Sequence, residues 1–343
     1  MSGRQSIFLI AALAAVAGAA WYRAAVFMPP PIVARPVIVL LASGSTPYWQ
    51  LTTNGAKAAA DKFNVDLRIE TPKGAETLEQ QMQALSGLEL DNINGVAFSP
   101  VDPEGETRLI NTMAQKTLVV TLDADAPLSL RQCHIGTSNV AAGRLCARLV
   151  EEAVPGGGKV AVALANLTKS TNIDRKTAFE KSLGHDDDAP PAADQPTYEL
   201  LEPLVDEGDD DKCRQLIKDT LAAHPDVACF VALNARQGPL LLEVLKEQDK
   251  LGKIQLVTFD EADETLRGVE DGHIFATVVQ DPYMYGFNTI RQLASLCRGE
   301  RDEIPIAGGG TIHVNAEAIR KENLEDFRKR LRERLPKDDV AAK

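Results

Sequence analysis

Short runs of apolar residues, rich in Val, Ile and Leu, recur along the chain from position 37. The runs cover 37–41, 118–122, 160–164, 229–233, 254–259 and 275–279. Continuous apolar runs of this length, followed by polar residues, are typical of strands buried on both faces of a parallel sheet. The sequence therefore predicts a sheet-based core whose strands end in polar groups.

Stretches with helical periodicity alternate with these runs. The first covers 53–63, where Ala56, Ala59, Ala60 and Phe63 share one face. Further helices are expected at 75–88, 103–115, 140–152, 174–183, 212–223, 239–250 and 283–297, and additional strands at 65–69, 95–99 and 198–204. The strand-helix rhythm restarts near Asn139, which is expected to cap the helix that follows. This pattern predicts an α/β fold with two doubly wound parallel-sheet lobes.

Polar and aromatic side chains stand where the predicted strands end. They are Tyr48 and Trp49 after the first run, Arg175 in the helix after the third, and Asp123, Asn234, Asp260 and Gln280 directly after four others. Ligands of open α/β sheets bind beyond the carboxyl ends of the strands. Aromatic rings together with carboxylate, guanidinium and amide groups suit a small, neutral, hydroxyl-rich molecule.

The N-terminus resembles an export signal. Arg4 precedes an apolar stretch at 7–20 that is rich in small residues and shorter than the roughly 20 residues of a spanning helix. Trp21 and Tyr22 extend this stretch, so an uncleaved anchor is the alternative to a cleaved signal. The three prolines at 29–31 predict a stiff spacer before the folded part.

Composition narrows the function classes. The net charge of −12 disfavours binding to a nucleic-acid backbone, which requires clustered Lys and Arg. The five cysteines lack metal-site spacing and are expected to be isolated buried thiols, with one or two disulfides as the alternative. The Gly-rich segment at 156–158 leads into a strand and predicts a turn, not a phosphate loop. No motif indicates a metal site, a cofactor or a catalytic nucleophile, so we expect a binding protein and not an enzyme.

The strand-end segments resemble the sugar-binding proteins of the ribose-binding, type 1 periplasmic family, over roughly 36–327. The segment 45–49, Ser-Thr-Pro-Tyr-Trp, is similar to the family's Asn-Pro-aromatic-aromatic turn. The segment 175–179 resembles its Arg-x-x-Gly-Phe helix, 257–260 its Gly-Phe-Asp strand, and 277–282 its Ala-Thr-Val-x-Gln-x-Pro segment. The resemblance implies two lobes joined by a three-segment hinge, closure of the lobes on a sugar, and delivery to an ABC transporter permease. It also implies a monomer without cofactor or nucleic acid.

The resemblance assigns ligand roles residue by residue. They fall on Thr46, Tyr48, Trp49, Asp123, Arg175, Asn234, Asp260 and Gln280. The aromatic pair would contact the sugar ring, and the polar groups would bond its hydroxyls. Ribose binders carry Asn at Thr46, Arg at Ala124 and an aromatic residue at Gly208, which disfavours ribose itself and favours another pentose, a hexose or a polyol. Asp125 is expected to substitute in part for the missing Arg.

The expected domain division follows the same resemblance. Residues 1–25 form the signal or anchor and 26–35 the spacer. Lobe 1 comprises 36–137 plus 281–309, lobe 2 comprises 138–280 plus 310–320, and a charged tail at 321–343 follows. The crossovers are expected near 134–139, 259–263 and 280–282, and 316–334 is expected to form an exposed helix. A membrane-anchored ligand-sensing subunit for a kinase or chemoreceptor is the alternative function; a repressor-like regulator would need a helix-turn-helix where the apolar segment lies.

Overall fold

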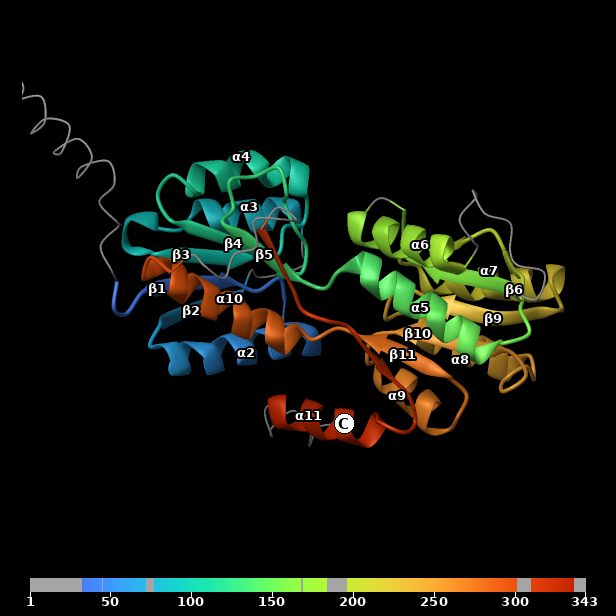
Figure 1. Cartoon of the computed structure of the whole chain (residues 1–343). Helices are drawn as coiled ribbons and strands as arrows, with labels where there is room; N and C mark the ends of the chain where they lie inside the picture. Colours follow the sequence, from blue (N-terminus) through green and yellow to red (C-terminus); the bar gives the residue numbers. More distant parts are fainter. Residues whose placement is uncertain are drawn as a thin grey trace, which may run out of the picture.

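The computed structural model describes residues 33–44, 46–71, 77–167, 169–183, 196–300 and 310–335. The expected signal at 1–25 and most of the spacer lie outside these residues. Within them the chain forms two α/β lobes, each built on one sheet that is mainly parallel (Figure 1). The predicted fold class is therefore confirmed.

Lobe 1 contains a six-stranded sheet with the order β12-β5-β4-β3-β1-β2. Its strands, all paired in parallel, are β1 (Val37–Leu41), β2 (Asp66–Glu70), β3 (Gly95–Phe98), β4 (Leu118–Leu122), β5 (Cys133–Gly136) and β12 (Thr311–His313). Helices α2 (Pro47–Phe63) and α10 (Pro282–Cys297) pack on one face of the sheet. Helices α3 (Leu78–Ser86) and α4 (Pro103–Met113) pack on the other, and the 3-10 turn η1 (Leu90–Asn92) precedes β3. Successive strand residues alternate between the two cores, because strand side chains point to opposite faces in turn.

Lobe 2 repeats this design with a seven-stranded sheet of order β13-β11-β10-β9-β6-β7, in which β8 also pairs with β6. The strands are β6 (Gly158–Leu164), β7 (Tyr198–Leu200), β8 (Leu204–Val205), β9 (Val227–Ala232), β10 (Gln255–Phe259), β11 (Ala276–Val279) and β13 (Glu317–Ile319). Only the β11–β13 pair among them is antiparallel. Helices α5 (Asn139–Ala153) and α6 (Ser170–Leu183) pack on one face. Helices α7 (Asp210–Ala223), α8 (Gln237–Glu247) and α9 (Asp263–Glu270) pack on the other.

The chain crosses between the lobes after β5, after β11 and between β12 and β13. The crossover expected near 259–263 is wrong, because α9 returns the chain to β11 of the same sheet. The assignment of all of 310–320 to lobe 2 also needs correction. Thr311–His313 pairs in parallel with β5 of lobe 1 before the chain reaches β13 of lobe 2.

Glycines allow the helices behind each half of the site to touch through their backbones. A Cβ on Gly286 of α10 would lie 1.8 Å from the Thr52 carbonyl oxygen of α2, and a Cβ on Gly55 would lie 1.9 Å from the Tyr283 carbonyl oxygen. In lobe 2, a Cβ on Gly143 of α5 would lie 2.2 Å from the carbonyl oxygen of Arg175 on α6. Only glycine fits such approaches. Close helix packing therefore holds Tyr48 at the start of α2 and Arg175 in α6 in place.

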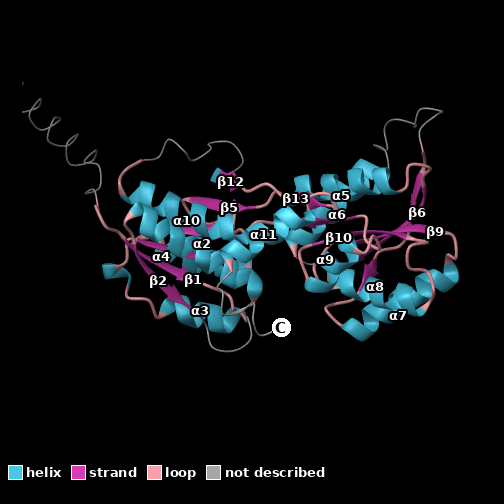
Figure 2. Cartoon of the chain, turned by 90° about the horizontal axis from the view of Figure 1, so that it is seen from below, coloured by secondary structure: helices cyan, strands magenta, loops and turns pink. Residues whose placement is uncertain are grey.

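The C-terminal part of the described chain lies against both lobes. Helix α11 (Leu324–Arg334) contacts α9 of lobe 2 and α2 of lobe 1, and both views place it beside the boundary between the lobes (Figures 1 and 2). Leu324 and Phe327 are buried in the lobe 2 core. The expectation of one exposed helix over 316–334 is wrong. Residues 317–319 form the edge strand β13, and the apolar residues at the start of α11 face lobe 2.

Candidate functional site

Two aspartates occupy equivalent places in the two sheets. Asp123 follows β4, the third strand from the β12 edge of the lobe 1 sheet. Asp260 follows β10, the third strand from the β13 edge of the lobe 2 sheet. Both have a left-handed backbone, with φ of 63° and 62°. Their N–H groups donate to carbonyl oxygens of the neighbouring strand, at Ile135 (2.9 Å) and Val278 (2.7 Å). Asp tolerates this conformation better than most residues. Each carboxylate is therefore fixed at its strand end by the same backbone turn.

The carboxylate of Asp123 is bonded within its own lobe. The Tyr48 hydroxyl at the start of α2 donates to Oδ1 (2.5 Å), and the Ser99 hydroxyl after β3 donates to Oδ2 (3.3 Å). The Ala124 N–H in turn donates to the Ser99 oxygen at 3.2 Å. Burial raises the pKa of Asp123, while the two hydroxyl bonds oppose that rise. Burial, and then the charge of Asp123, raise the pKa of Tyr48 well above its usual value, so its proton stays in place.

Arg175 is the buried cation of the lobe 2 half. Its side chain is 5% exposed and lies over the Phe259 ring, with Cζ 3.7 Å from the ring centroid. Nη1 donates to the Leu233 carbonyl, and Nη2 donates to Asn139 Oδ1 at 2.8 Å. Nε is buried and has no hydrogen-bond partner among the described residues. A guanidinium held this rigidly can offer its remaining donor to a ligand.

Asn234 joins three segments at the end of β9. Its Oδ1 accepts from the Ala165 N–H (2.9 Å), and its Nδ2 donates to Asn172 Oδ1 (2.9 Å). Asn172 is itself buried and donates to the carbonyl of Asn166 at 3.1 Å. These bonds fix the amide of Asn234 beside the helix that carries Arg175.

Asp260 is linked to the hinge through Gln280. Gln280 Nε2 donates to Asp260 Oδ1 (3.1 Å), and the buried Tyr285 hydroxyl lies 3.1 Å from Gln280 Oε1. The same hydroxyl accepts from the Thr137 N–H at 3.1 Å, and Thr137 Oγ1 donates to the Val314 carbonyl at 3.0 Å. Burial raises the pKa of Tyr285 far above its usual value. Tyr285 therefore joins all three crossovers next to the lobe 2 carboxylate.

Charges of the two lobes act on one another at this place. Burial raises the pKa of Asp260, the charge of Arg175 lowers it, and the charge of Asp123 in lobe 1 raises it further. The charge of Arg175 likewise lowers the pKa of Asp123. Because such effects require proximity in a poorly solvated region, Asp123, Arg175 and Asp260 lie near one another across the two lobes, and their joint role in binding a ligand stays a prediction.

Not all of the predicted residues join that site in the same way. Thr46 is exposed, and its side chain makes no capping hydrogen bond at the start of α2. Trp49 is 7% exposed and packs in the lobe 1 core, with its ring edge-on to Tyr48 at a centroid distance of 5.5 Å. A ligand role for these two residues stays a prediction.

Asp125, the expected substitute for the missing Arg, already binds other residues of lobe 1. Asp125 binds the Arg131 guanidinium through both carboxylate oxygens, and the Thr121 hydroxyl donates to its Oδ1 at 2.8 Å. Arg131 holds the pKa of Asp125 below its usual value, although burial opposes the shift. The structure therefore gives no support to Asp125 as a ligand group, because its acceptors close the loop after β4.

Sequence reasoning missed Ser99, Asn139 and Asn172. Ser99 ends the third predicted strand, so the rule that identified Asp123 could have found it. Asn139 was expected to cap α5, but Ser138 is the N-cap, with its Oγ accepting from the Ala141 N–H, and Asn139 binds Arg175. Asn172 lies one helical turn before Arg175 and carried no signal in the sequence.

The rest of the described chain shows little competing chemistry. The five cysteines are buried and unpaired, as predicted, and burial raises the pKa of Cys146 to about 12. No group of His, Cys, Asp and Glu among the described residues could hold a metal ion. Over the same residues, no helix combines the length and apolar character needed to cross a membrane.

Comparison with known proteins supports the assignment of the fold and family. The model of the periplasmic binding protein domain family matches residues 37–301. The ribose import binding protein of Haemophilus influenzae is 22% identical over 264 residues, which are 76% of this chain and 85% of that protein. A glucose-galactose binding protein from Geobacillus stearothermophilus has a similar structure, with a TM-score of 0.73, 26% identity, and coverage of 84% of this chain and 99% of that one.

A second solved structure agrees. An ABC transporter solute binding protein from Burkholderia graminis, in complex with D-arabinose, gives a TM-score of 0.72 and 26% identity, covering 85% of this chain and 98% of that one. The family match extends over most of the chain and includes both lobes. The chain belongs to the periplasmic binding protein family and, within it, to the type 1 group that resembles the ribose-binding proteins.

Proposed function

We propose that this protein captures a small sugar or polyol between its lobes and delivers it to an ABC importer in the membrane. The observation that carries the proposal is the matched placement of Asp123 and Asp260 at strand ends of the two lobes, with Asp260 bonded to Gln280 of the hinge and the charge of Arg175 acting on both carboxylates. A ligand bound there would contact both lobes, so it would favour the closed arrangement over the open one.

The chemistry of the site supports a hydroxyl-rich ligand. Asp260 Oδ2 and the buried Arg175 Nε have no hydrogen-bond partner in the described part of the chain, so lobe 2 offers an acceptor and a donor that the protein leaves unused. A neutral polyol can both donate and accept hydrogen bonds through each hydroxyl, and it adds no charge beside the two carboxylates, whereas a phosphate would add negative charge and a simple cation cannot accept. The names of the relatives, which bind ribose, arabinose, glucose or galactose, agree with this class.

The hinge supports the mechanism. Three crossovers connect the lobes, and the Tyr285 hydroxyl joins Thr137 of the first to Gln280 of the second. Gln280 also bonds Asp260, so a ligand that contacts the Asp260 carboxylate is connected to the hinge through this one hydrogen bond. Closure about few linking residues is a common response of two-lobed binding proteins. The family and the apolar N-terminal segment support a periplasmic location.

A ligand screen tests the proposal. The segment 36–343 would be titrated by isothermal calorimetry with pentoses, hexoses and polyols, after a thermal-shift screen to select candidates. Asp260→Ala should abolish the heat of binding for any hit. Asp271→Ala, at the exposed C-cap of α9, is the matched control and should leave it unchanged. Absence of binding by every carbohydrate, with the protein folded, would refute the proposal.

A second measurement separates transport from sensing. Small-angle scattering should show compaction on ligand addition in either case. Uptake of the labelled ligand by cells should be lost on deletion of the gene and restored by the wild type, but not by Asp260→Ala. Normal uptake together with a lost transcriptional response would favour the ligand-sensing alternative.

A further inference from the structure

The two carboxylates of the site differ in how much of their hydrogen-bonding capacity is already used. Both oxygens of Asp123 accept from hydroxyls of lobe 1, namely those of Tyr48 and Ser99. The Asp260 carboxylate accepts only from Gln280, through one oxygen, among the described residues. A ligand therefore meets a carboxylate with a protein donor on each oxygen on the lobe 1 side, and one with a protein donor on a single oxygen on the lobe 2 side.

The Tyr48 hydroxyl stands where a ligand hydroxyl would otherwise donate to Asp123. Its single proton is directed at Oδ1, and its raised pKa keeps that proton bound. The two protein hydroxyls also take the place of a cation, because no Lys or Arg of the described chain forms an ion pair with Asp123. Arg175 acts on Asp123 only through its charge, from the other lobe.

The remaining groups next to Asp123 are poor in ligand donors and acceptors. Ala124 contributes a methyl group, and its N–H is bonded to Ser99. In lobe 2, in contrast, Asp260 Oδ2 and the buried Nε of Arg175 have no hydrogen-bond partner in the described part of the chain. The site thus has a lobe 1 side whose polar groups are bonded to one another and a lobe 2 side with polar atoms that have no protein partner in the described part of the chain.

We propose that the Tyr48 hydroxyl substitutes for a ligand hydroxyl at Asp123, and that the ligand is a deoxy sugar or a polyol whose hydroxyls lie along one edge. The hydroxyl-bearing edge faces lobe 2, and a deoxy carbon or C–H edge faces Tyr48 and Ala124. This inference rests on the proposed sugar-binding function. It makes Tyr48 a specificity-determining residue through its hydroxyl and not only through its ring.

Calorimetric titration with matched ligand pairs tests the inference. The pairs are D-ribose and 2-deoxy-D-ribose, L-galactose and L-fucose, L-mannose and L-rhamnose, and D-galactose and D-fucose. The wild type should bind the deoxy member of at least one pair as tightly as its hydroxylated partner, or more tightly. In Tyr48→Phe an acceptor of Asp123 is left without a donor, so the affinity ratio should move at least roughly tenfold toward the hydroxylated member.

Two further variants keep the result decisive. Ser99→Ala frees the other oxygen of Asp123 and should move the ratio in the same direction, even if Tyr48→Phe proves too unstable to titrate. Tyr198→Phe removes a hydroxyl that donates to the Val154 carbonyl at 2.9 Å, at the amino end of β7 and away from the carboxyl ends of the strands, and should leave the ratio unchanged.

The outcomes separate this inference from the proposed function. Binding with an unchanged ratio in both Tyr48→Phe and Ser99→Ala would overturn the inference alone. A wild type that prefers the hydroxylated member of every pair by more than about tenfold would do the same. Failure of all carbohydrates to bind the wild type would remove the proposed function and the inference with it.

Discussion

The two lobes share the same backbone turn at an aspartate that ends a strand, but different side chains surround the two aspartates. Asp123 and Asp260 end equivalent strands in the left-handed conformation and are bonded to the adjacent strand in the same way. In lobe 1, hydroxyl groups of Tyr48 and Ser99 satisfy the carboxylate. In lobe 2, an amide and the buried Arg175 surround it. The repeated topology thus fixes where a carboxylate stands, while the neighbouring side chains decide whether it is available to a ligand.

The largest expected effect comes from what the lobes share, the glycine contacts behind each half of the site. Gly286→Ala should lower the free energy of unfolding by roughly 3 kcal/mol, because its Cβ would meet the Thr52 carbonyl at 1.8 Å. Gly143→Ala in lobe 2, with 2.2 Å to the Arg175 carbonyl, should cost a similar or smaller amount. Guanidinium unfolding measures both.

A matched glycine provides the control for this comparison. Gly156 has no neighbour within 4 Å of a built Cβ, so Gly156→Ala should change stability by less than about 0.5 kcal/mol. If Gly286→Ala were equally harmless, α2 and α10 would be free to separate, and the shared packing would not position Tyr48.

The next effect addresses the difference between the lobes. Arg175→Ala should reduce stability by about 3 kcal/mol, since it removes two charge-assisted hydrogen bonds and the contact with Phe259. Tyr48→Phe, which removes one hydroxyl bond, should cost only about 1 kcal/mol. Unfolding curves of the two variants, without ligand, give the ratio.

An exposed arginine calibrates the Arg175 result. Arg267 pairs with Glu264 at the surface, with side chains 60% and 58% exposed, so Arg267→Ala should cost well under about 1 kcal/mol. Equal losses for Arg175→Ala and Arg267→Ala would contradict the view that lobe 2 holds a buried, structurally essential cation.

The sequence predicted the topology well because buried parallel strands and amphipathic helices leave strong periodic signals. It placed Asp123, Asp260 and Gln280 correctly at strand ends for the same reason. It could not predict that Asp125 would be bound by Arg131, or that Trp49 would pack into the core, because both depend on contacts between distant segments. The third crossover was misplaced because nothing in the short segment that forms β12 indicates locally that it pairs with β5 of lobe 1.

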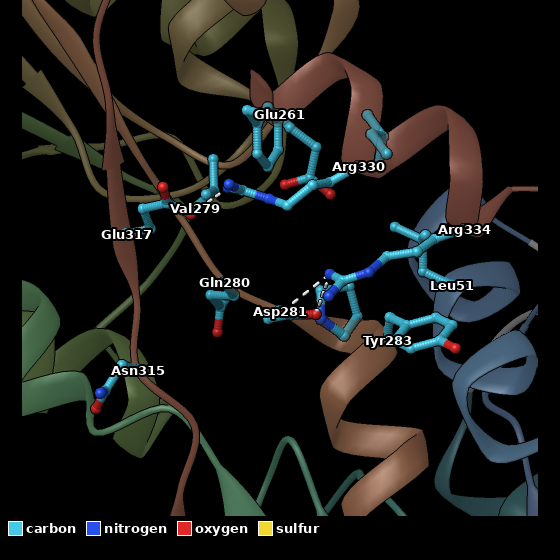
Figure 3. Close-up of a pocket in the computed structure, with 13 residues that line it drawn as sticks. Leu51, Glu261, Val279, Gln280, Asp281, Tyr283, Asn315, Glu317, Arg330 and Arg334 are labelled. Carbon is cyan, nitrogen blue, oxygen red and sulfur yellow. Dashed lines mark hydrogen bonds and ion pairs between the residues drawn. The ribbon is translucent and has the colours of Figure 1, made fainter. Parts of the chain in front are cut away.

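A smaller effect should appear in the pH dependence of stability, and it belongs to lobe 2. Ala124 follows Asp123, whereas Glu261 follows Asp260 and lines a small cavity of about 60 Å³ beside α11 (Figure 3). Burial, and then the charge of Asp260, raise the pKa of Glu261 to about 8 from 4.5. The contribution of its neutral form to stability is complete below pH 4.5 and is lost as the pH rises toward 8.

Glu261→Gln removes this titration and serves as the comparison. The wild type should gain stability relative to Glu261→Gln as the pH falls from 8 to 5, with the folded state taking up to one additional proton. Urea unfolding across this range measures the difference. Parallel stability curves for the two proteins would show that Glu261 is solvated and that the lobes do not differ in this respect.

The smallest effect concerns the contact that links the two lobes behind the site. Arg334 at the end of α11 pairs with Asp281, the N-cap of α10, at 3.0 Å and lies over the Tyr283 ring with Cζ 4.6 Å from its centroid (Figure 3). Its carbonyl accepts from the Asn54 side chain of α2 at 3.0 Å. Because both charged side chains remain more than one-quarter exposed, Arg334→Ala should cost only about 0.5 kcal/mol.

A double-mutant cycle of Arg334 with Asp281 isolates the energy of this ion pair. The cycle is needed because Asp281 also caps α10, so replacing Asp281 alone would change the cap as well as the pair. Arg332, paired with Glu325 inside α11, is the matched control that reaches no other element. A coupling energy for Arg334 and Asp281 no greater than that for Arg332 and Glu325 would mean that this ion pair does not link α11 to lobe 1, and that the helix is held by Leu324 and Phe327 in lobe 2 and by the Asn54 bond in lobe 1.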